Sequence, residues 1–174
     1  MSVRPARHGD VPEMSAIHVA GFEAAHRGIF SGESLAVRTH ALRERVWTQR
    51  LAAPPDRSFV LVAEIEGQVA GFTSGRPARE DEDDGEGLGR WEDLYVSSRH
   101  KPRSLIATPL VAAARDRFRE LGFADFVGFF AEDNESAGRY IQETLGMRTD
   151  GHVVVIDDAR VLRFRAGLSG WPED

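Results

Sequence analysis

The stretch from residue 90 to residue 131 limits the fold more than any other part of the chain, because strand and helix patterns alternate along it. The segment 90–96 has the composition of a strand, and a loop containing Pro102 follows. Thr108-Pro109 is a favourable pair of N-cap and first helical residue, so we expect a helix from there to Leu121. A second, buried-type strand covers 125–131. This order indicates a mixed α/β fold.

The rest of the chain supplies further elements of the same sheet. Residues 3–6 predict an edge strand because Pro5 has no amide to donate, and Asp10 is a candidate cap for a helix that ends near Gly28. The other predicted elements are a helical stretch from Ser31 or Ser34 to Pro54 with Leu35, Leu42, Val46 and Leu51 on one side, a hairpin of 59–63 and 68–74 around Glu66-Gly67, a helix over 135–145, and a hairpin of 153–156 and 161–164 around Asp157-Asp158. We therefore expect one domain, residues 1–174, without an internal repeat.

Composition excludes several classes of protein. Folding a chain of 174 residues buries roughly 70% of the unfolded surface, so the core needs no covalent staples. The absence of cysteine excludes a disulfide framework, a thiolate zinc site and a cysteine nucleophile, and none of the six histidines has His-x-x-x-His spacing, so we expect no metal site. The N-terminus lacks a signal-peptide pattern and no apolar run reaches the ~20 residues of a membrane span. We expect a cytoplasmic protein that does not act at a membrane.

Charge is unevenly distributed. The net charge of −6 disfavours binding to a nucleic-acid backbone. The densest basic stretch, Arg99 to Arg103, is too short for a polynucleotide but suits one or two phosphates. The acidic run from Glu80 to Asp84 either attracts a cationic acceptor such as a polyamine or is a solvated loop, and we favour the loop.

Eight short motifs occur in a characteristic order along nearly the whole chain. They are Val3-Arg4-Pro5-Ala6, Ile17-His18-Val19-Ala20, Ala25-His26-Arg27-Gly28, Phe59-Val60-Leu61-Val62-Ala63-Glu64, Val69-Ala70-Gly71-Phe72, Leu94-Tyr95-Val96, Glu132-Asp133-Asn134 and Leu145-Gly146-Met147. Together they resemble the GCN5-related N-acetyltransferase (GNAT) superfamily, especially its small bacterial members. The resemblance implies a mixed, mostly antiparallel central sheet with one splayed parallel strand pair, flanked by about four helices. It also implies that acetyl-CoA, or another acyl-CoA, docks between the splayed strands.

The resemblance places the cofactor site on Leu94, Tyr95, Val96, the loop after them, and Asn134. In the family this loop carries an Arg/Gln-x-x-Gly-x-Gly/Ala pattern whose amides hold the pyrophosphate. Here the loop is Lys101-Pro102-Arg103-Ser104-Leu105-Ile106, so Ser104 and Ile106 occupy the glycine positions. With a helix start at Thr108-Pro109, the nearest helical amides, Leu110 and Val111, would lie about one turn, ~5 Å, further away. Either the side chains of Lys101, Arg103 and Ser104 replace the lost contacts, or the loop is simply solvated.

Two residues are candidates for acid–base chemistry. Strand alternation predicts Arg90, Glu92 and Leu94 on one face and Trp91, Asp93 and Tyr95 on the other, and Glu92 is our candidate general base or else a solvent-facing carboxylate. The resemblance places a tyrosine acid seven residues after Asn134, which is Ile141; Tyr140 lies one residue earlier, a rotation of ~100° on a helix. The segment 134–146 is one residue longer than in the family, so a helical bulge could bring Tyr140 back to the position of the family's tyrosine. Without a bulge, Tyr140 packs against the sheet.

The acceptor pocket in the family lies along the first two helices. This implies substrate contacts from Phe22, His26 and Arg27, although His26 equally suits a structural role at a helix C-terminus. The implied function is acyl-CoA-dependent N-acyltransfer to a small amine, which attacks the thioester directly. The alternative is a GNAT-fold protein that no longer uses acetyl-CoA and instead binds a small molecule or catalyses another reaction in the same cleft. A homodimer is common in the family, and nothing in the sequence tests it.

Overall fold

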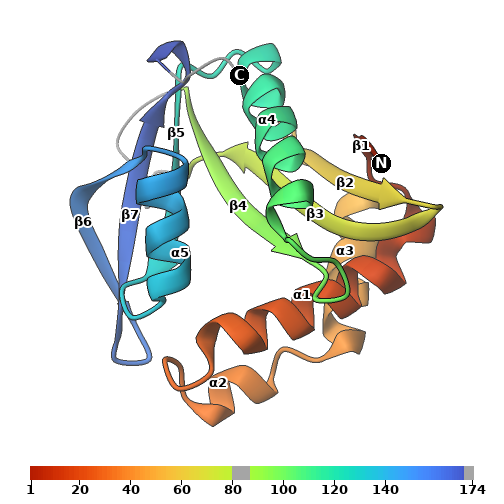
Figure 1. Ribbon diagram of the computed structural model, residues 1–174, viewed down its shortest axis with the longest axis horizontal. Helices are drawn as coiled ribbons and strands as arrows, with labels where there is room; N and C mark the ends of the chain where they lie inside the picture. Colours follow the sequence, from red (N-terminus) through yellow and green to blue (C-terminus); the bar gives the residue numbers. More distant parts are fainter. Residues whose placement is uncertain (80–86, 171–174) are drawn as a thin grey trace.

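A computed structural model describes residues 1–79 and 87–170, so the acidic run from Glu80 to Asp84 lies outside the described residues. One seven-stranded sheet has the order β1-β2-β3-β4-β5-β7-β6 (Figure 1). Its strands are β1 Ser2–Pro5, β2 Phe59–Ile65, β3 Gln68–Pro77, β4 Leu88–Val96, β5 Asp125–Ala131, β6 Arg148–Ile156 and β7 Ala159–Gly167. The helices are α1 Val11–His26, α2 Gly32–Ala36, α3 His40–Ala52, α4 Ser104–Glu120 and α5 Glu135–Arg139, with short turns η1 His8–Asp10, η2 Tyr140–Thr144 and η3 Leu168–Gly170. Within the described residues, no helix is long and apolar enough to cross a membrane.

The strands β4 and β5 form the one parallel pair of this sheet, and every other described pair is antiparallel. Their pairing covers only 88–90 against 125–127, after which the two strands diverge (Figure 1). The edge of β4 that faces β5 therefore has no strand partner from Trp91 to Val96 within the described chain. The predicted mixed sheet with a splayed parallel pair is confirmed.

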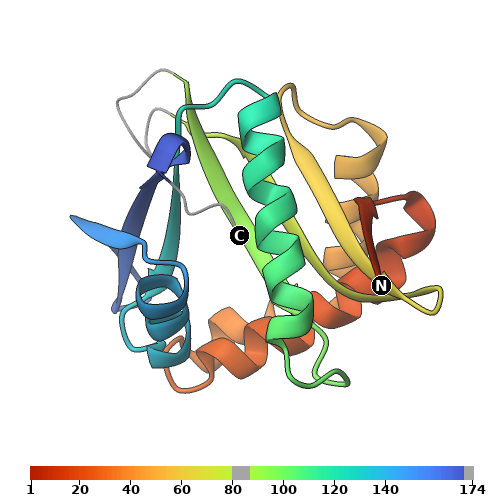
Figure 2. The same cartoon turned by 45° about the horizontal axis from the view of Figure 1, so that its top comes forward.

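Helices cover both faces of the sheet. On one face, α1 and α3 place Met14 and Trp47 against Phe72 of β3. On the other, α4 packs Leu110 and Phe118 against the central strands, and Figure 2 shows this helix crossing in front of the sheet. Burying these two apolar surfaces at ~25 cal/mol per Å² is the main source of stability, and it also holds β4 between α1 and α4.

The second helical stretch differs from its prediction. It is divided into α2 and α3 because the Thr39 hydroxyl accepts a hydrogen bond from the Leu42 amide at 3.2 Å and begins a new helix. The new start rotates the buried face. Trp47 is 2% exposed and fills the core, whereas Val46, which we expected there, is 38% exposed.

The start of α4 also differs. This helix begins at Ser104, and Pro109 lies inside it rather than at its first position. Ile106, which is 1% exposed, extends the apolar face by one turn toward the N-terminus, and its burial favours the earlier start. Pro109 lacks the amide that would reach the carbonyl of Leu105, but Leu105 is 65% exposed, so water can serve that carbonyl. Leu110 and Val111 are buried inside the helix and are not donors at its N-terminus.

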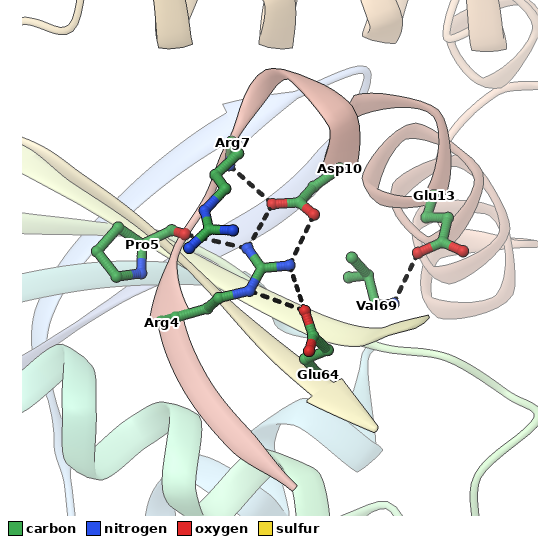
Figure 3. Close-up of polar contacts among 7 residues, drawn as sticks. All are labelled: Arg4, Pro5, Arg7, Asp10, Glu13, Glu64 and Val69. Carbon is green, nitrogen blue, oxygen red and sulfur yellow. Dashed lines mark hydrogen bonds and ion pairs between the residues drawn. The ribbon is translucent and has the colours of Figure 1, made fainter. Parts of the chain in front are cut away.

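A network of polar contacts fixes the beginning of α1 to the sheet (Figure 3). Asp10 precedes the helix as predicted, but its carboxylate does not cap it. The carboxylate instead accepts hydrogen bonds from the Arg4 guanidinium at 2.7 and 2.9 Å and from the Arg7 amide at 2.7 Å. Arg4 also donates to Glu64 of β2 at 2.8 Å, and Glu13 of α1 accepts from the Val69 amide at 2.6 Å. These bonds hold the pKa of Asp10 below its ordinary value, chiefly through Arg4.

Candidate active site

A cleft of about 1100 Å³ opens where β4 and β5 diverge. Its walls come from α1, β4, the loop that follows β4, the start of α4, and the segment from residue 134 to residue 141. Nine of the predicted site residues line it: His26, Glu92, Leu94, Tyr95, Val96, Arg103, Ser104, Asn134 and Tyr140. Lys101, Pro102, Leu105 and Ile106 do not line it, and Phe22 and Arg27 line a separate hollow of about 330 Å³ between α1 and α2.

The cofactor side of the cleft combines basic side chains with a helix start. Arg99, His100 and Arg103 line it, and Ser104 is the first residue of α4. A helix N-terminus carries a partial positive charge and favours anions. Ile106, at the second of the family's glycine positions, packs inward against Ala63, Ala70 and Leu110. Of the two residues that stand at the family's glycine positions, Ser104 lines the cleft and Ile106 does not.

A β-bulge in β4 decides which side chains face which side. Opposite β3, Ser74 is paired with Asp93 and the adjacent Gly75 with Trp91, so Glu92 is an extra residue. The predicted strict alternation is therefore wrong at this point. Trp91 and Leu94 both belong to the cluster under α4, while Glu92 contacts Arg50 of α3 on the opposite side.

Glu92 is held by two arginines. Its carboxylate lies 2.6 Å from the Arg50 guanidinium and 2.6 Å from that of Arg76. All three side chains are largely buried, and ion pairs of this kind stabilise the charged carboxylate. These two contacts give Glu92 a structural role, while its role as base stays a prediction.

Asp93, next to it, has the opposite environment. Its Oδ2 accepts a hydrogen bond from the Ser74 hydroxyl at 2.6 Å, and it forms no ion pair among residues 1–79 and 87–170. Burial raises the pKa of Asp93, and the charge of Glu92 raises it further. Sequence reasoning passed over Asp93, because only the bulge brings two successive carboxylates to the same side. A raised carboxyl pKa in a cleft is typical of an acid–base residue.

Tyr95 lies beneath α1 on this same side of β4. Its ring stacks on His18 with centroids 4.7 Å apart, and a Cβ at Gly21 would come within 2.6 Å of it, so the glycine permits the close contact. His18 is 5% exposed, and burial lowers its pKa to about 3. His18 is thus a neutral packing residue at physiological pH, and it fixes the Tyr95 ring.

The far wall of the cleft contains Asn134 and Tyr140. Asn134 caps α5, accepting a hydrogen bond from the Ala137 amide at 3.1 Å. A π-turn over Tyr140–Thr144, closed by a 3.0 Å bond from the Leu145 amide to the Tyr140 carbonyl, absorbs the extra residue of this segment. The turn begins at Tyr140, so the extra residue is absorbed after Tyr140 and not before it. The Tyr140 hydroxyl is buried and has no hydrogen-bond partner in the described part of the chain, and burial raises its pKa.

The family model for the acetyltransferase (GNAT) family matches residues 24–147, which is more than half of the chain. The chain belongs to this family. The GNAT match includes β4, the loop after it, α4, β5 and α5, and therefore most of the cleft. A comparison with curated proteins gives no match.

Solved GNAT structures share the fold. PaiA N-acetyltransferase from Thermoplasma acidophilum, in complex with coenzyme A, has a TM-score of 0.74 at 10% identity, covering 93% of this chain and 96% of that one. Ribosomal-protein-alanine N-acetyltransferase from Brucella melitensis has 0.72 at 22% identity, covering 96% and 99%. YncA from Salmonella typhimurium, a putative acetyltransferase with its cofactor acetyl-CoA, has 0.71 at 18%, covering 100% and 97%. At these sequence identities the likeness to the solved structures shows the fold alone. Separately, the described residues contain no group of three or more His, Cys, Asp or Glu side chains that could hold a metal ion.

Proposed function

We propose that this GNAT protein is an acyl-CoA-dependent N-acyltransferase, with acetyl-CoA as donor and a small amine as acceptor. The observation that carries the proposal is the juxtaposition of an unpaired β4 edge, the start of α4 and the raised-pKa carboxyl of Asp93 around one cleft. The β4 edge offers backbone groups to an extended pantetheine arm, in the manner of an added strand. The start of α4 with Arg99, His100 and Arg103 suits the phosphates.

Bound acyl-CoA supplies a thioester whose acyl carbon forms the new C–N bond while its C–S bond breaks. Asp93 receives the proton that the ammonium must lose, directly or through a water molecule, and its raised pKa suits that task. Glu92 holds Arg50 and Arg76, and through them the bulge, so we assign it a positioning role in place of the base. Tyr140 is the candidate acid for the departing thiolate, because it lines the cleft and its buried hydroxyl has no hydrogen-bond partner among residues 1–79 and 87–170.

Isothermal titration of the purified protein with acetyl-CoA and with CoA tests the cofactor assignment. We expect saturable binding of both at micromolar to millimolar concentration. Absence of heat at millimolar concentration would overturn the proposal. Release of CoA thiol in the presence of an amine panel then tests the transfer.

The second candidate is a GNAT-fold protein that has left CoA chemistry, and the observation in its favour is Ser104 at the cleft in place of a glycine. Ser104→Gly separates the two. If Ser104 obstructs the phosphates, the variant binds CoA at least tenfold more tightly than the wild type. If the Ser104 hydroxyl is instead a ligand of the phosphates, affinity for CoA falls several-fold. Ile106→Gly is uninformative, because it would remove a core side chain that is 1% exposed.

A further inference from the structure

Two aromatic rings fill the apex of the cleft, where β4 and β5 part. Trp91 is the first residue of β4 beyond the pairing of 88–90 with 125–127, and it lines the cleft. Phe164 of β7 lines the cleft as well, and the ring centroids of the two residues lie 6.1 Å apart at an interplanar angle of 89°. Both side chains are buried, with exposed fractions of 8% for Trp91 and 3% for Phe164. We call Trp91 and Phe164 the apical pair.

A glycine in β5 lets the Phe164 ring reach the apex. Gly128 is the first β5 residue beyond the pairing with β4, and it lies opposite Phe164 in the ladder of β5 and β7. A Cβ at Gly128 would collide with the Phe164 ring. The ring therefore occupies space beside β5 that a side chain at this position would otherwise take.

The Trp91 ring is held in place by buried contacts. Its Nε1 donates a hydrogen bond to Thr73 Oγ1 at 2.8 Å, and that hydroxyl donates to the Asp93 carbonyl at 2.7 Å. Phe126 of β5 packs edge-on against the ring, with centroids 5.9 Å apart. If the ring swung aside, the buried indole N–H would lose its partner, which costs free energy. Trp91 is therefore a fixed wall of the apex.

The proposed binding of acyl-CoA directs the acyl group at the apical pair. With the phosphates at the start of α4, the pantetheine arm runs back along the open edge of β4 from Val96 toward Trp91. This edge is about 17 Å long at the usual ~3.3 Å rise per residue, similar to an extended phosphopantetheine arm. The thioester end of the arm then reaches the apex, and an acyl chain that continues beyond the thioester meets the two rings.

We propose that the apical pair sets the length of the acyl group and restricts the donor to short-chain acyl-CoA, with acetyl-CoA preferred. This inference rests on the proposed N-acyltransferase function and names its donor class. An acetyl group ends one carbon beyond the carbonyl and stops short of the rings. Each further methylene must displace a buried ring, and a close-packed interior resists such insertion.

Binding measurements on the full-length protein test this inference without knowledge of the acceptor. Isothermal titration compares CoA, acetyl-CoA, butyryl-CoA and hexanoyl-CoA. We expect acetyl-CoA to bind more tightly than hexanoyl-CoA by about tenfold or more, with butyryl-CoA between them. Equal affinity for the three thioesters, or tighter binding of the longer ones, would overturn the inference.

Variants locate the effect at the apex. Trp91→Leu and Phe164→Leu each open space there, and Phe118→Leu is the control, because Phe118 belongs to the same core cluster but does not line the cleft. We expect each apical variant to bind hexanoyl-CoA at least as tightly as acetyl-CoA, and Phe118→Leu to keep the wild-type order. A folded apical variant that keeps the wild-type preference would contradict the assignment.

Circular dichroism and urea denaturation show which variants fold. If one apical variant does not fold, the other carries the comparison, and the wild-type series can overturn the inference by itself.

The two proposals fail in different ways. If the wild type gives no heat with CoA or with any thioester, the N-acyltransferase function falls, and the length restriction falls with it. If acetyl-CoA and hexanoyl-CoA bind equally tightly, the function stands and only the length restriction is wrong.

Discussion

Asp10 and Asp93 both lie near arginines, yet their pKa values are displaced in opposite directions. Asp10 accepts two bonds from Arg4 and one from the Arg7 amide, and its charge is fully compensated (Figure 3). Asp93 accepts one neutral hydroxyl, because Arg50 is paired with Glu92 and Arg43 forms no ion pair with it. The first arrangement fixes the chain. The arrangement at Asp93 leaves its carboxyl group available to a ligand, and for this reason we place the proton transfer at Asp93.

The largest effect that this contrast predicts is on turnover. Asp93→Asn keeps the hydrogen bond from Ser74 but cannot accept the ammonium proton, so kcat should fall about 100- to 1000-fold with little change in acetyl-CoA affinity. Steady-state kinetics and titration measure the two quantities. Glu92→Gln is the matched comparison, and we expect it to weaken the fold more than the chemistry because it releases Arg50 and Arg76. A larger loss of kcat in Glu92→Gln, in a folded protein, would return the role of base to Glu92.

The sequence predicts the sheet but not the details of this site. Turn residues placed both hairpins correctly, since Glu66-Gly67 and Asp157-Asp158 all adopt the positive φ that such turns require. The bulge at Glu92 has no local signal, because it depends on how β3 pairs with β4. Thr108-Pro109 is a strong local signal for a helix start, yet the burial of Ile106 overrode it. The sequence also could not predict that Arg43 forms no ion pair with a described carboxylate, because this depends on which carboxylates the other arginines bind.

The next largest effect should be on stability, at the β1 edge of the sheet. Arg4→Met leaves Asp10 and Glu64 without their shared partner, and Asp10 is largely buried. We expect the free energy of unfolding to fall by about 3 kcal/mol in urea denaturation. Arg7→Met, which leaves the Arg7 amide in place, should cost less than about 0.5 kcal/mol because that side chain is exposed. Equal losses in the two variants would show that the Arg4 network contributes little.

The smallest effect is a difference in how stability depends on pH. The lowered pKa of Asp10 means that its contribution is present above the unfolded value of about 3.9 and is lost as pH falls through the lower folded value. The raised pKa of Asp93 has the reverse sign, because the folded state holds this proton more tightly than the unfolded chain does. Asp93 therefore costs stability increasingly as pH rises from about 4 to above its folded pKa.

Asp93→Asn tests this sign directly. The variant should gain stability relative to the wild type as pH rises from about 4 to 8, and the two should converge at the acid end. Urea denaturation of the wild type and the variant at a series of pH values measures the difference. A variant that loses stability relative to the wild type as pH rises would mean that Asp93 is compensated in the fold as Asp10 is. The raised pKa that supports its role as base would then have no physical origin.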